Sequence, residues 1–586
     1  MSRSAHRPAK SAAPAPLAAA VTESPAPLVA PPWLRPLILL LAASMLFIWF
    51  ATEVADSDTW WHLKTGQYIL QTHKLPVPDP FAFTTATAGS AYPAEDTVRY
   101  FNLTHEWLAQ VIFYLIYAAG GFTGLVVFRS LLMIAVCALV GIVAWRRCGN
   151  FYLAVGAGIA AASVGIVFHA DRPFLFSFLF FAATIALLEY RRWLWALPPM
   201  FLFWANCHGG FFLGWALVGA YCAEPLLARY RGRPQTGDKK LYLIGAIAIA
   251  ASGLNPNFFT PVIMPLLYRD SVMQKLIWEW QHTALWPLEP FQVMFFITLI
   301  VTLLAWRRVR LTDWLLFLAF GAGALWAVRN VMLFGIVAPF LIAAYFPWKR
   351  AWPAIAQFAA AGLLVLGLGL ALMGGDILQF RAAAWRYPWG AAQFLEAHHV
   401  ESRMLNSYDF GGFLIWRLWP QEKVFIDGRA LSDNVFKDYR KIVYNMVGSD
   451  PLQLLDRYGI EVIVLDGFEF RSGEPFRLVP DLALSTPVDW HLVYWDDTAT
   501  VFMRHPPPGM QSLPNGFAIN SMEAQCEKYI AHDPLHPRCA RGLGYLYSQI
   551  SEYARARKWF AYYLNHAVEA DPEAQAVYSR LLASGK

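Results

Sequence analysis

The sequence predicts a polytopic α-helical membrane protein, followed by a small α/β domain and a short helical segment. Three observations support this fold class. Of the 586 residues, 57% are hydrophobic and only 15% are charged, which is more apolar side chain than one soluble core can bury. Apolar runs of about 14 to 23 residues recur between residue 34 and residue 375. Beyond residue 375, short β-rich runs and amphipathic helical patterns replace them.

The N-terminal residues 1–33 are rich in Ala and Pro and contain too few large apolar residues to fold alone. We expect a disordered cytoplasmic tail. The first apolar run extends from Leu34 to about Val54. It is longer than the apolar region of a signal peptide and lacks a convincing small-x-small cleavage site, so it is expected to remain as a membrane anchor.

Ten more apolar runs bring the expected number of membrane spans to about eleven, within a transmembrane domain of residues 34–375. They cover 123–145, 151–168, 174–190, 193–206, 211–228, 241–255, 291–305, 311–328, 331–346 and 353–373. The segment 107–121 has an apolar core that is short for a hydrocarbon layer of about 30 Å. We therefore place it as an interfacial or re-entrant helix in an outer loop of residues 55–122.

The basic residues set the expected orientation. The N-terminal tail and alternate loops carry 18 Lys and Arg residues, against seven in the intervening loops. Because basic loops stay inside, the N-terminus is expected in the cytoplasm and the C-terminal domains outside. The net charge of +6 is therefore explained by the basic loops on the cytoplasmic side, and no nucleic-acid partner is expected.

The loops assigned to the outer face each carry a compact polar or aromatic signature. They are "DSDTWWH" at 56–62, "NLTHEW" at 102–107, "HADRP" at 169–173, "NCHGG" at 206–210, "LNPN" at 254–257, "IWEWQH" at 277–282 and "VRN" at 328–330. Ionisable groups near a membrane usually mark a site or a water-filled cavity, so one cavity that opens outward would explain the whole set. Ordinary interface chemistry, with Trp belts, helix caps and Pro at turns, is the alternative.

With these motifs, residues 34–375 resemble the GT-C superfamily of integral-membrane glycosyltransferases. "DSD" at 56–58 stands where those enzymes carry a DxD-type motif in the first outer loop. "THEWL" at 104–108 stands where many have a His-Pro-Pro-Leu-like or Lys-Pro-Pro-Leu-like motif, and "DRPFLFSFLFF" at 171–181 resembles their Arg-x-x-Pro-Asp-like start of a later span. Glu106 and Trp107 replace the two prolines, so the chain looks like a divergent branch close to bacterial proteins with an Asp-x-Asp-x-Trp-Trp-His-Leu signature. This resemblance implies a place in the bacterial inner membrane.

The resemblance implies an inverting transferase that takes a sugar from a polyprenyl-phosphate carrier and passes it to a lipid, glycan or protein acceptor. Such a reaction needs a base for the acceptor. In a helix that begins near Asp58, Trp61 and His62 share its face, which places a carboxylate base beside a ring that can stack on a sugar. Asp56 either shares a divalent cation, Mg²⁺ or Mn²⁺, with Asp58 or caps the helix. Glu106 is a further candidate catalytic carboxylate.

A departing phosphate calls for positive charge. The candidates on the outer face are Arg172, Arg329, His105 and His208. Arg172 is preferred because it lies at a span boundary with no adjacent acid except Asp171.

The region after the last span is expected to form an extracytoplasmic α/β domain of residues 376–506. Its β-rich runs lie at 423–429, 460–466 and 490–504. Asp427 and Arg429, in a glycine-bearing loop, could touch the acceptor or form a local ion pair within a turn.

Residues 517–586 are expected to be helical and to contact a protein. Their spacing of Leu543, Gly544, Tyr547, Tyr553, Ala556 and Phe560 resembles a tetratricopeptide repeat. The six cysteines show no CxxC spacing; Cys526 and Cys539 are the two that could pair, and the sequence leaves open whether they do.

Two other classes of function stay open. The first is a non-catalytic membrane scaffold or assembly protein that acts through the C-terminal α/β and repeat-like region. The second is a transporter, or a polysaccharide polymerase or ligase, since segments interrupted by Gly and Pro such as "SGLNPNFFTPVIMP" at 252–265 can form broken helices.

Overall fold

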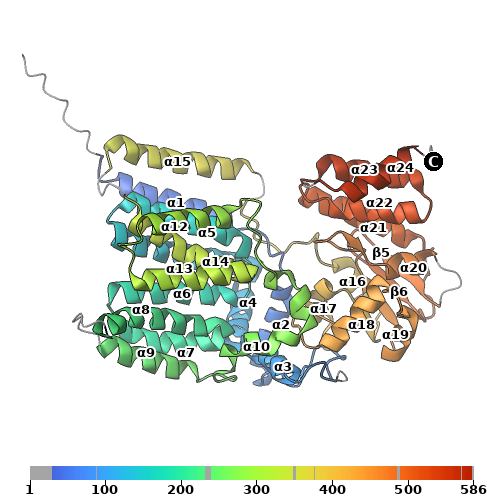
Figure 1. Ribbon diagram of the computed structural model, residues 1–586. Helices are drawn as coiled ribbons and strands as arrows, with labels where there is room; N and C mark the ends of the chain where they lie inside the picture. The colour runs from blue at the N-terminus through green and yellow to red at the C-terminus, as the bar shows by residue number, and fades with distance from the viewer. Residues whose placement is uncertain are drawn as a thin grey trace, which may run out of the picture.

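The computed structural model describes residues 30–86, 89–230, 239–347, 352–374, 377–484, 489–568 and 570–583. An apolar helical bundle and a mixed α/β part lie side by side (Figure 1), with α2 (Asp58–Thr72), α3 (Glu95–Thr104) and α10 (Met264–Leu267) between them. The predicted tail lies almost wholly outside the described residues. So do most of the basic loop at 229–240 and the basic pair at 349 and 350.

Helices form in all eleven apolar runs of the bundle. They are α1 (Leu34–Phe50), α4 (Trp107–Cys148), α5 (Phe151–Gly165), α6 (Phe174–Tyr190), α7 (Leu197–Cys207), α8 (Phe212–Tyr230), α9 (Lys239–Ser252), α12 (Pro290–Leu304), α13 (Leu311–Trp326), α14 (Val331–Tyr345) and α15 (Ala354–Met373). Among the described residues, five helical segments are long and apolar enough to cross a membrane, and four shorter apolar helices accompany them. The chain is therefore a mostly helical membrane protein, but the expected count of about eleven spans is not confirmed.

The segment 107–121 is continuous with the run that follows it, apart from a break inside α4. Gly121 has φ +59° and ψ −150°, a conformation that glycine adopts without the strain a side chain would bring. The first part of α4 packs closely on α2: a Cβ at Gly66 would lie 2.1 Å from the carbonyl oxygen of Gln110. This contact fixes α2, with its acidic N-terminus, against the end of the bundle.

The C-terminal part is built on a four-stranded sheet with the order β1-β2-β6-β5. Its strands are β1 (Met404–Asn406), β2 (Val462–Leu465), β5 (His491–Trp495) and β6 (Thr500–Met503); β1 and β2 are parallel and the other pairs antiparallel. A small ribbon of β3 (Phe468–Glu469) and β4 (Glu474–Pro475) lies outside it. The helices α16 (Trp389–Ala397), α17 (Gly411–Leu418), α18 (Asp433–Tyr444), α19 (Pro451–Tyr458) and α20 (Leu478–Leu484) complete this part.

The prediction of a strand at 423–429 is wrong. Val424 instead pairs with the outer loop: its N–H donates to Phe81 O at 3.1 Å, and Phe83 N–H donates to Val424 O at 3.2 Å. This isolated bridge joins the C-terminal part to the loop that follows α2. A pattern of apolar residues cannot reveal that the partner of such a segment lies in a loop near the other end of the chain.

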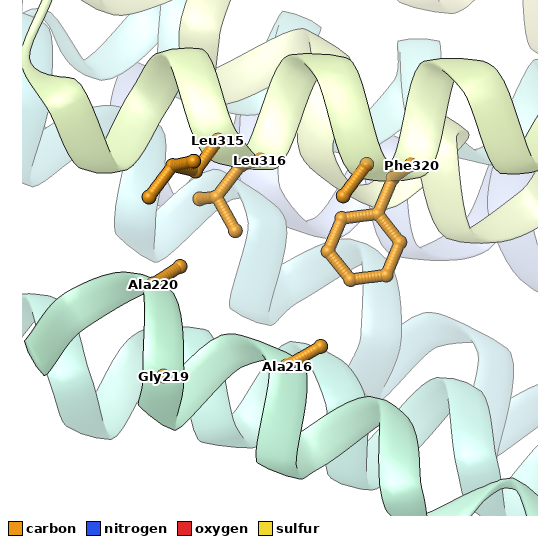
Figure 2. Close-up of a pocket in the computed structure, with 7 residues that line it drawn as sticks. Ala216, Gly219, Ala220, Leu315, Leu316 and Phe320 are labelled. Atoms are coloured by element: carbon orange, nitrogen blue, oxygen red, sulfur yellow. The ribbon is translucent and has the colours of Figure 1, made fainter. Parts of the chain in front are cut away.

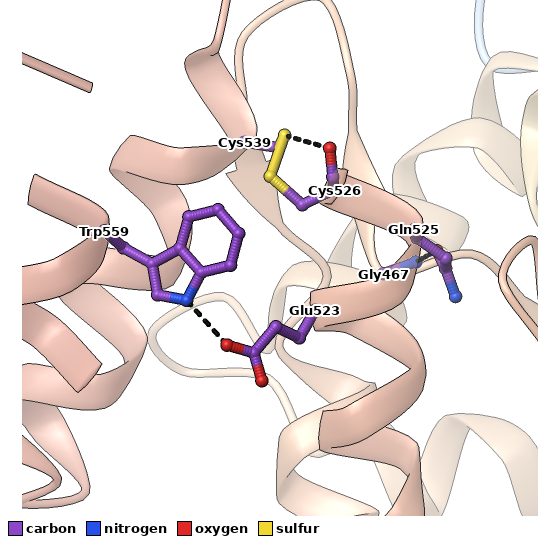
Figure 3. Close-up of a disulfide and its surroundings, with 6 residues drawn as sticks. All are labelled: Gly467, Glu523, Gln525, Cys526, Cys539 and Trp559. Atoms are coloured by element: carbon purple, nitrogen blue, oxygen red, sulfur yellow. Dashed lines mark hydrogen bonds between the residues drawn. A yellow bond between two sulfur atoms is a disulfide. The ribbon is translucent and has the colours of Figure 1, made fainter. Parts of the chain in front are cut away.

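The last helices are α21 (Phe517–His532), α22 (Arg538–Gln549), α23 (Tyr553–His566) and α24 (Pro572–Ala583). A disulfide joins Cys526 to Cys539, the one pairing that the sequence left open, and so ties α21 to α22 (Figure 3). On α21, Gln525 accepts the N–H of Gly467 at 2.7 Å and Glu523 accepts the indole N–H of Trp559 at 2.9 Å. These helices therefore pack onto the α/β part and share one apolar core with it.

Candidate active site

A cavity of about 1920 Å³ lies between the bundle and the C-terminal part. Its wall contains all nine residues that the sequence analysis selected: Asp56, Asp58, Trp61, His62, His105, Glu106, Arg172, His208 and Arg329. Side chains from the outer loop, the bundle and the C-terminal part all line it. The structure thus brings together residues that are far apart in the sequence.

The helix α2 begins at Asp58, as its sequence pattern predicts. Its first backbone N–H, that of Asp58, donates to Asp56 Oδ1 at 2.9 Å, so Asp56 satisfies one of the N–H groups that a helix start leaves unpaired. The carboxylate of Asp58 lies against the backbone of Gly428, where a Cβ would be 2.0 Å from Oδ1. Only glycine at position 428 leaves room for Asp58 in this place.

Arg172 is surrounded by acids. Its Nε donates to Asp56 Oδ1 at 2.8 Å, its Nη1 donates to Glu279 Oε1 at 2.9 Å, and its Nη2 lies 3.2 Å from Asp58 Oδ2. Asp171 instead pairs with the buried Arg129 at 2.6 Å. The premise that Arg172 has no acidic neighbour except Asp171 is therefore wrong, since the neighbours come from distant segments.

The two aspartates at the start of α2 differ in acidity. Burial raises the pKa of Asp56, but the ion pair with Arg172 and the N–H of Asp58 outweigh it and hold the pKa below its ordinary value. Burial also raises the pKa of Asp58, to about 7, because Arg172 offsets only part of this effect and the charge of Asp56 adds to it. Asp58 is therefore the carboxyl that can exchange a proton near neutral pH.

Three histidines surround Glu106, the N-cap residue of α4. Its carboxylate lies 3.2 Å from His105 Nε2, 3.8 Å from His62 Nδ1 and 3.8 Å from His208 Nε2. Gln110 Nε2 lies 3.3 Å from the same nitrogen of His62. Glu106 therefore holds these rings in place from the centre of the cluster.

His62 and His208 are neutral at physiological pH. Burial lowers the pKa of His62 to about 4 and that of His208 to about 3, although Glu106 opposes both shifts. Gly210 N–H donates to His208 Nδ1 at 3.1 Å, so the ring proton of His208 is on Nε2, which faces Glu106. Neutral rings can donate one hydrogen bond but bring no positive charge to a phosphate.

Arg329 lies over the ring of Trp280, 4.2 Å from its centroid, in a cation–π contact. Trp61, in contrast, is only 5% exposed and packs against His62, so little of its ring is open to a sugar. More exposed rings of the cavity are Trp278 and Trp326, at 36% and 59%. These two tryptophans and Glu279 were not selected from the sequence, although "IWEWQH" and the loop at 328–330 marked their neighbourhoods.

The side chains of Asp56 and Asp58 do not fit a shared divalent cation as they are placed. Mg²⁺ and Mn²⁺ need several oxygens that point at one position, and the guanidinium of Arg172 fills the space between these carboxylates. Within the part of the chain that the structure describes, no three His, Cys, Asp or Glu side chains converge on a metal position.

The loop that carries Gly428 is held by a buried ion triad. Arg429 pairs with Asp427 at 2.7 Å and with Asp79, in the outer loop, at 2.6 Å. All three groups are almost fully buried. The interpretation of Asp427 and Arg429 as an ion pair in a turn is confirmed, and the pair extends across to the outer loop.

Known structures share this architecture, although no family model and no curated protein matches the sequence. The Archaeoglobus fulgidus oligosaccharyltransferase in its apo form aligns with a TM-score of 0.53 and 10% identity, over 84% of this chain and 78% of that one. The chain has a GT-C fold. Archaeal oligosaccharyltransferase AglB from the same organism, in complex with an inhibitory peptide and a dolichol-phosphate, aligns with a TM-score of 0.50 and 11% identity, over 84% and 77%.

The GT-C likeness extends past the bundle. The alignment covers 84% of this chain, which is more than the bundle can supply, because its last helix, α15, ends at Met373. The fold expected from residues 34–375 is thus confirmed, and the α/β part takes part in it. Identities of 10% and 11% establish the fold alone, so the activity is argued from the cavity.

Proposed function

We propose that the chain is an inverting membrane glycosyltransferase that moves a sugar from a polyprenyl-phosphate donor to an acceptor outside the cytoplasm. Asp58 is its general base. The observation that carries this proposal is the place of Asp58, a carboxyl with a pKa of about 7 on the wall of the large cavity. The GT-C fold supports it, as does the AglB complex, which holds a dolichol-phosphate and a peptide.

The reaction assigns a task to each charged group. The acceptor X–H attacks the anomeric carbon, its proton passes to Asp58, and the bond from that carbon to the phosphate oxygen breaks with its electron pair on the phosphate. Arg172 is engaged by three carboxylates, so Arg329 is the cation we assign to the departing phosphate. The neutral His208, with its proton on Nε2, and His105 line the same cavity.

An apolar groove between α8 and α13 supports a lipid-linked donor. It has a volume of about 200 Å³ and is lined only by apolar residues (Figure 2), namely Ala216, Gly219, Ala220, Leu315, Leu316, Ala319 and Phe320. Ala216, Ala319 and Phe320 also line the large cavity. A prenyl chain in this groove would place its phosphate in the cavity while its tail stays among apolar side chains.

The acceptor is expected from the opposite side. The C-terminal part contributes the facing wall of the cavity, including Arg386, Asp409 and Arg471. Burial raises the pKa of Asp409, although Arg386 opposes this shift. A lipid, a glycan or a protein could enter there, and residues 517–586 remain a candidate surface for a protein partner.

The decisive variant is Asp58→Asn, which keeps the shape of the side chain but cannot accept a proton as the carboxylate does. Loss of a general base lowers a rate by about 10²- to 10⁴-fold, so transfer should fall by that factor. Glycolipid and glycan profiles of cells that carry only the variant provide the measurement. Asp270→Asn is the matched control, because Asp270 is exposed and pairs only with the neighbouring Arg269 among the described residues.

Unchanged profiles in a folded Asp58→Asn protein would contradict the proposal. That result would favour the scaffold alternative, in which the cavity has no catalytic task. Native mass spectrometry can further distinguish the enzyme from the scaffold by detecting a bound prenyl phosphate, since a scaffold needs no such ligand. Deletion of 517–586 is a poor test of the scaffold, because these helices share the core of the α/β part.

A further inference from the structure

The strongest feature of the cavity that the proposed reaction does not explain is Arg172, whose guanidinium is fully engaged by carboxylates. Arg172 has three nitrogens, and each contacts a different carboxylate, from the loop before α2, the first turn of α2 and the 3₁₀ turn η6 (Trp278–Trp280). Its side chain is 21% exposed and those of Asp56 and Asp58 are 18% and 14% exposed. Three carboxylates this close together require a cation between them.

One oxygen of each aspartate already contacts this cation. Asp56 Oδ1 accepts from both Arg172 and the N–H of Asp58. Asp58 turns Oδ2 toward Arg172 and Oδ1 toward the backbone of Gly428. A planar fork of N–H donors matches such an arrangement, whereas a metal ion needs the oxygens directed at a single point.

The position of Arg172 is fixed from behind. The preceding residue, Asp171, binds Arg129, and Arg129 Nε donates to Phe50 O at 3.2 Å at the end of α1. Arg129 also donates to Thr52 O. The backbone that carries Arg172 is therefore anchored by a buried network that also holds the chain leading to Asp56, while the guanidinium itself is held by its three carboxylates.

We propose that Arg172 takes the place of a divalent metal in this site: it supplies the fixed positive charge and holds Asp58 in position, so that the site works without a bound cation. The catalytic role of Arg172 rests on the proposed function, but its contacts with the three carboxylates do not depend on that function. Arg172 is a positioning residue, and the acid cluster becomes a cation site only when the guanidinium is removed.

Manganese binding tests this inference without any assay of transfer. The six-line electron paramagnetic resonance signal of free Mn²⁺ is followed while the purified protein is added. Wild type should bind no more Mn²⁺ than the Asp58→Asn variant does. Arg172→Ala should bind about one Mn²⁺ per chain, and Arg172→Ala/Asp58→Asn should lose it.

Two matched variants sharpen the comparison. Arg172→Lys keeps the positive charge and should exclude Mn²⁺ as wild type does. Arg269→Ala removes an exposed arginine that also lies beside an aspartate, and it should gain no Mn²⁺. A gain limited to Arg172→Ala therefore reports the acid cluster of the cavity.

Two outcomes overturn the inference. One is Mn²⁺ binding by wild type that Asp58→Asn abolishes. The other is a folded Arg172→Ala protein that binds no more Mn²⁺ than wild type. If Arg172→Ala does not fold, the wild-type titration still decides. A failure of the proposed function would instead appear as unchanged glycan profiles in Asp58→Asn, whatever the Mn²⁺ result.

Discussion

Asp58 owes its chemistry to its surroundings. Its neighbour Asp56 lies two residues away and contacts the same arginine, but it also receives a backbone N–H. Burial raises the pKa of both carboxyls, but the ion pair with Arg172, helped by this hydrogen bond, keeps Asp56 charged, and that charge then disfavours ionisation of Asp58. Two carboxyls of one motif thus divide into a permanent anion and a group that titrates near neutral pH.

Transfer should therefore rise with pH through about 7, since the base must be deprotonated before it can accept a proton. The contribution of Asp58 to the unfolding free energy changes in the opposite direction and falls as pH rises. A raised carboxyl pKa means that the folded chain binds this proton more tightly than the unfolded chain does. The contribution of Asp58 to the unfolding free energy is full below about pH 4 and is lost as pH rises toward 7.

Thermal unfolding of wild type and Asp58→Asn between pH 5 and pH 8 measures this contribution, because groups that do not interact with Asp58 cancel in the difference. The melting temperature of the variant should fall less with increasing pH than that of wild type. Parallel curves, or a transfer rate that declines through pH 7, would contradict the assigned pKa.

Sequence could predict which residues line the cavity but not how they pair. Asp56, Glu106 and His208 were found because acids and histidines are unusual beside apolar runs. Glu279 was missed because it lies in a short turn and its role depends on a contact with Arg172, 107 positions away in the sequence. The close approach of Gly428 to Asp58 has no local signal at all.

At the scale of elements, α8 and α13 form the groove because small residues stand where the two helices face each other. Gly219 and Ala220 on α8 oppose Leu315 and Leu316 on α13 (Figure 2). Nothing lies within 4 Å of the position that a Cβ of Gly219 would take. A side chain at 219 would therefore begin in open space beside the groove, where its outer atoms can compete with a bound chain for the volume.

Gly219→Leu should consequently weaken binding of the lipid-linked donor, by about tenfold or about 1.4 kcal/mol, with the fold intact. The matched control is Gly369→Leu on α15, where a Cβ also meets nothing within 4 Å and which lines neither this groove nor the large cavity. KM for the donor is the measurement. Equal KM values in both variants would remove the groove from the donor path.

The helices themselves were predictable, since each apolar run contains one. The sheet was predicted less well. The runs 460–466 and 490–504 contain β2, β5 and β6, but β1 has only three residues and was not recognised. Its partner β2 lies about 58 positions along the chain, so pairing, and not local pattern, makes it a strand.

At the scale of the whole molecule, the two ends of the bundle are chemically distinct. Arg147 and Arg310, from two loops assigned to the cytoplasm, both bind Asp313, at 2.7 Å and 2.9 Å. The segment after α1 pairs with the segment after α15: Val54 N–H donates to Arg381 O, and Ala383 N–H donates to Val54 O, both at 2.9 Å. Helices α1 and α15, adjacent in Figure 1, therefore end at the same face.

This pairing makes a topological prediction that does not depend on the exact number of spans. If α1 enters from the cytoplasm, the chain after α15 must lie outside, together with Asp58 and the α/β part. A reporter enzyme that is active only outside the cytoplasm, fused after residue 374, should be active, and the same reporter fused after residue 308, in the basic loop, should be silent. Activity at 308 and silence at 374 would move the cavity to the cytoplasmic side, where a base at Asp58 could not serve an acceptor outside.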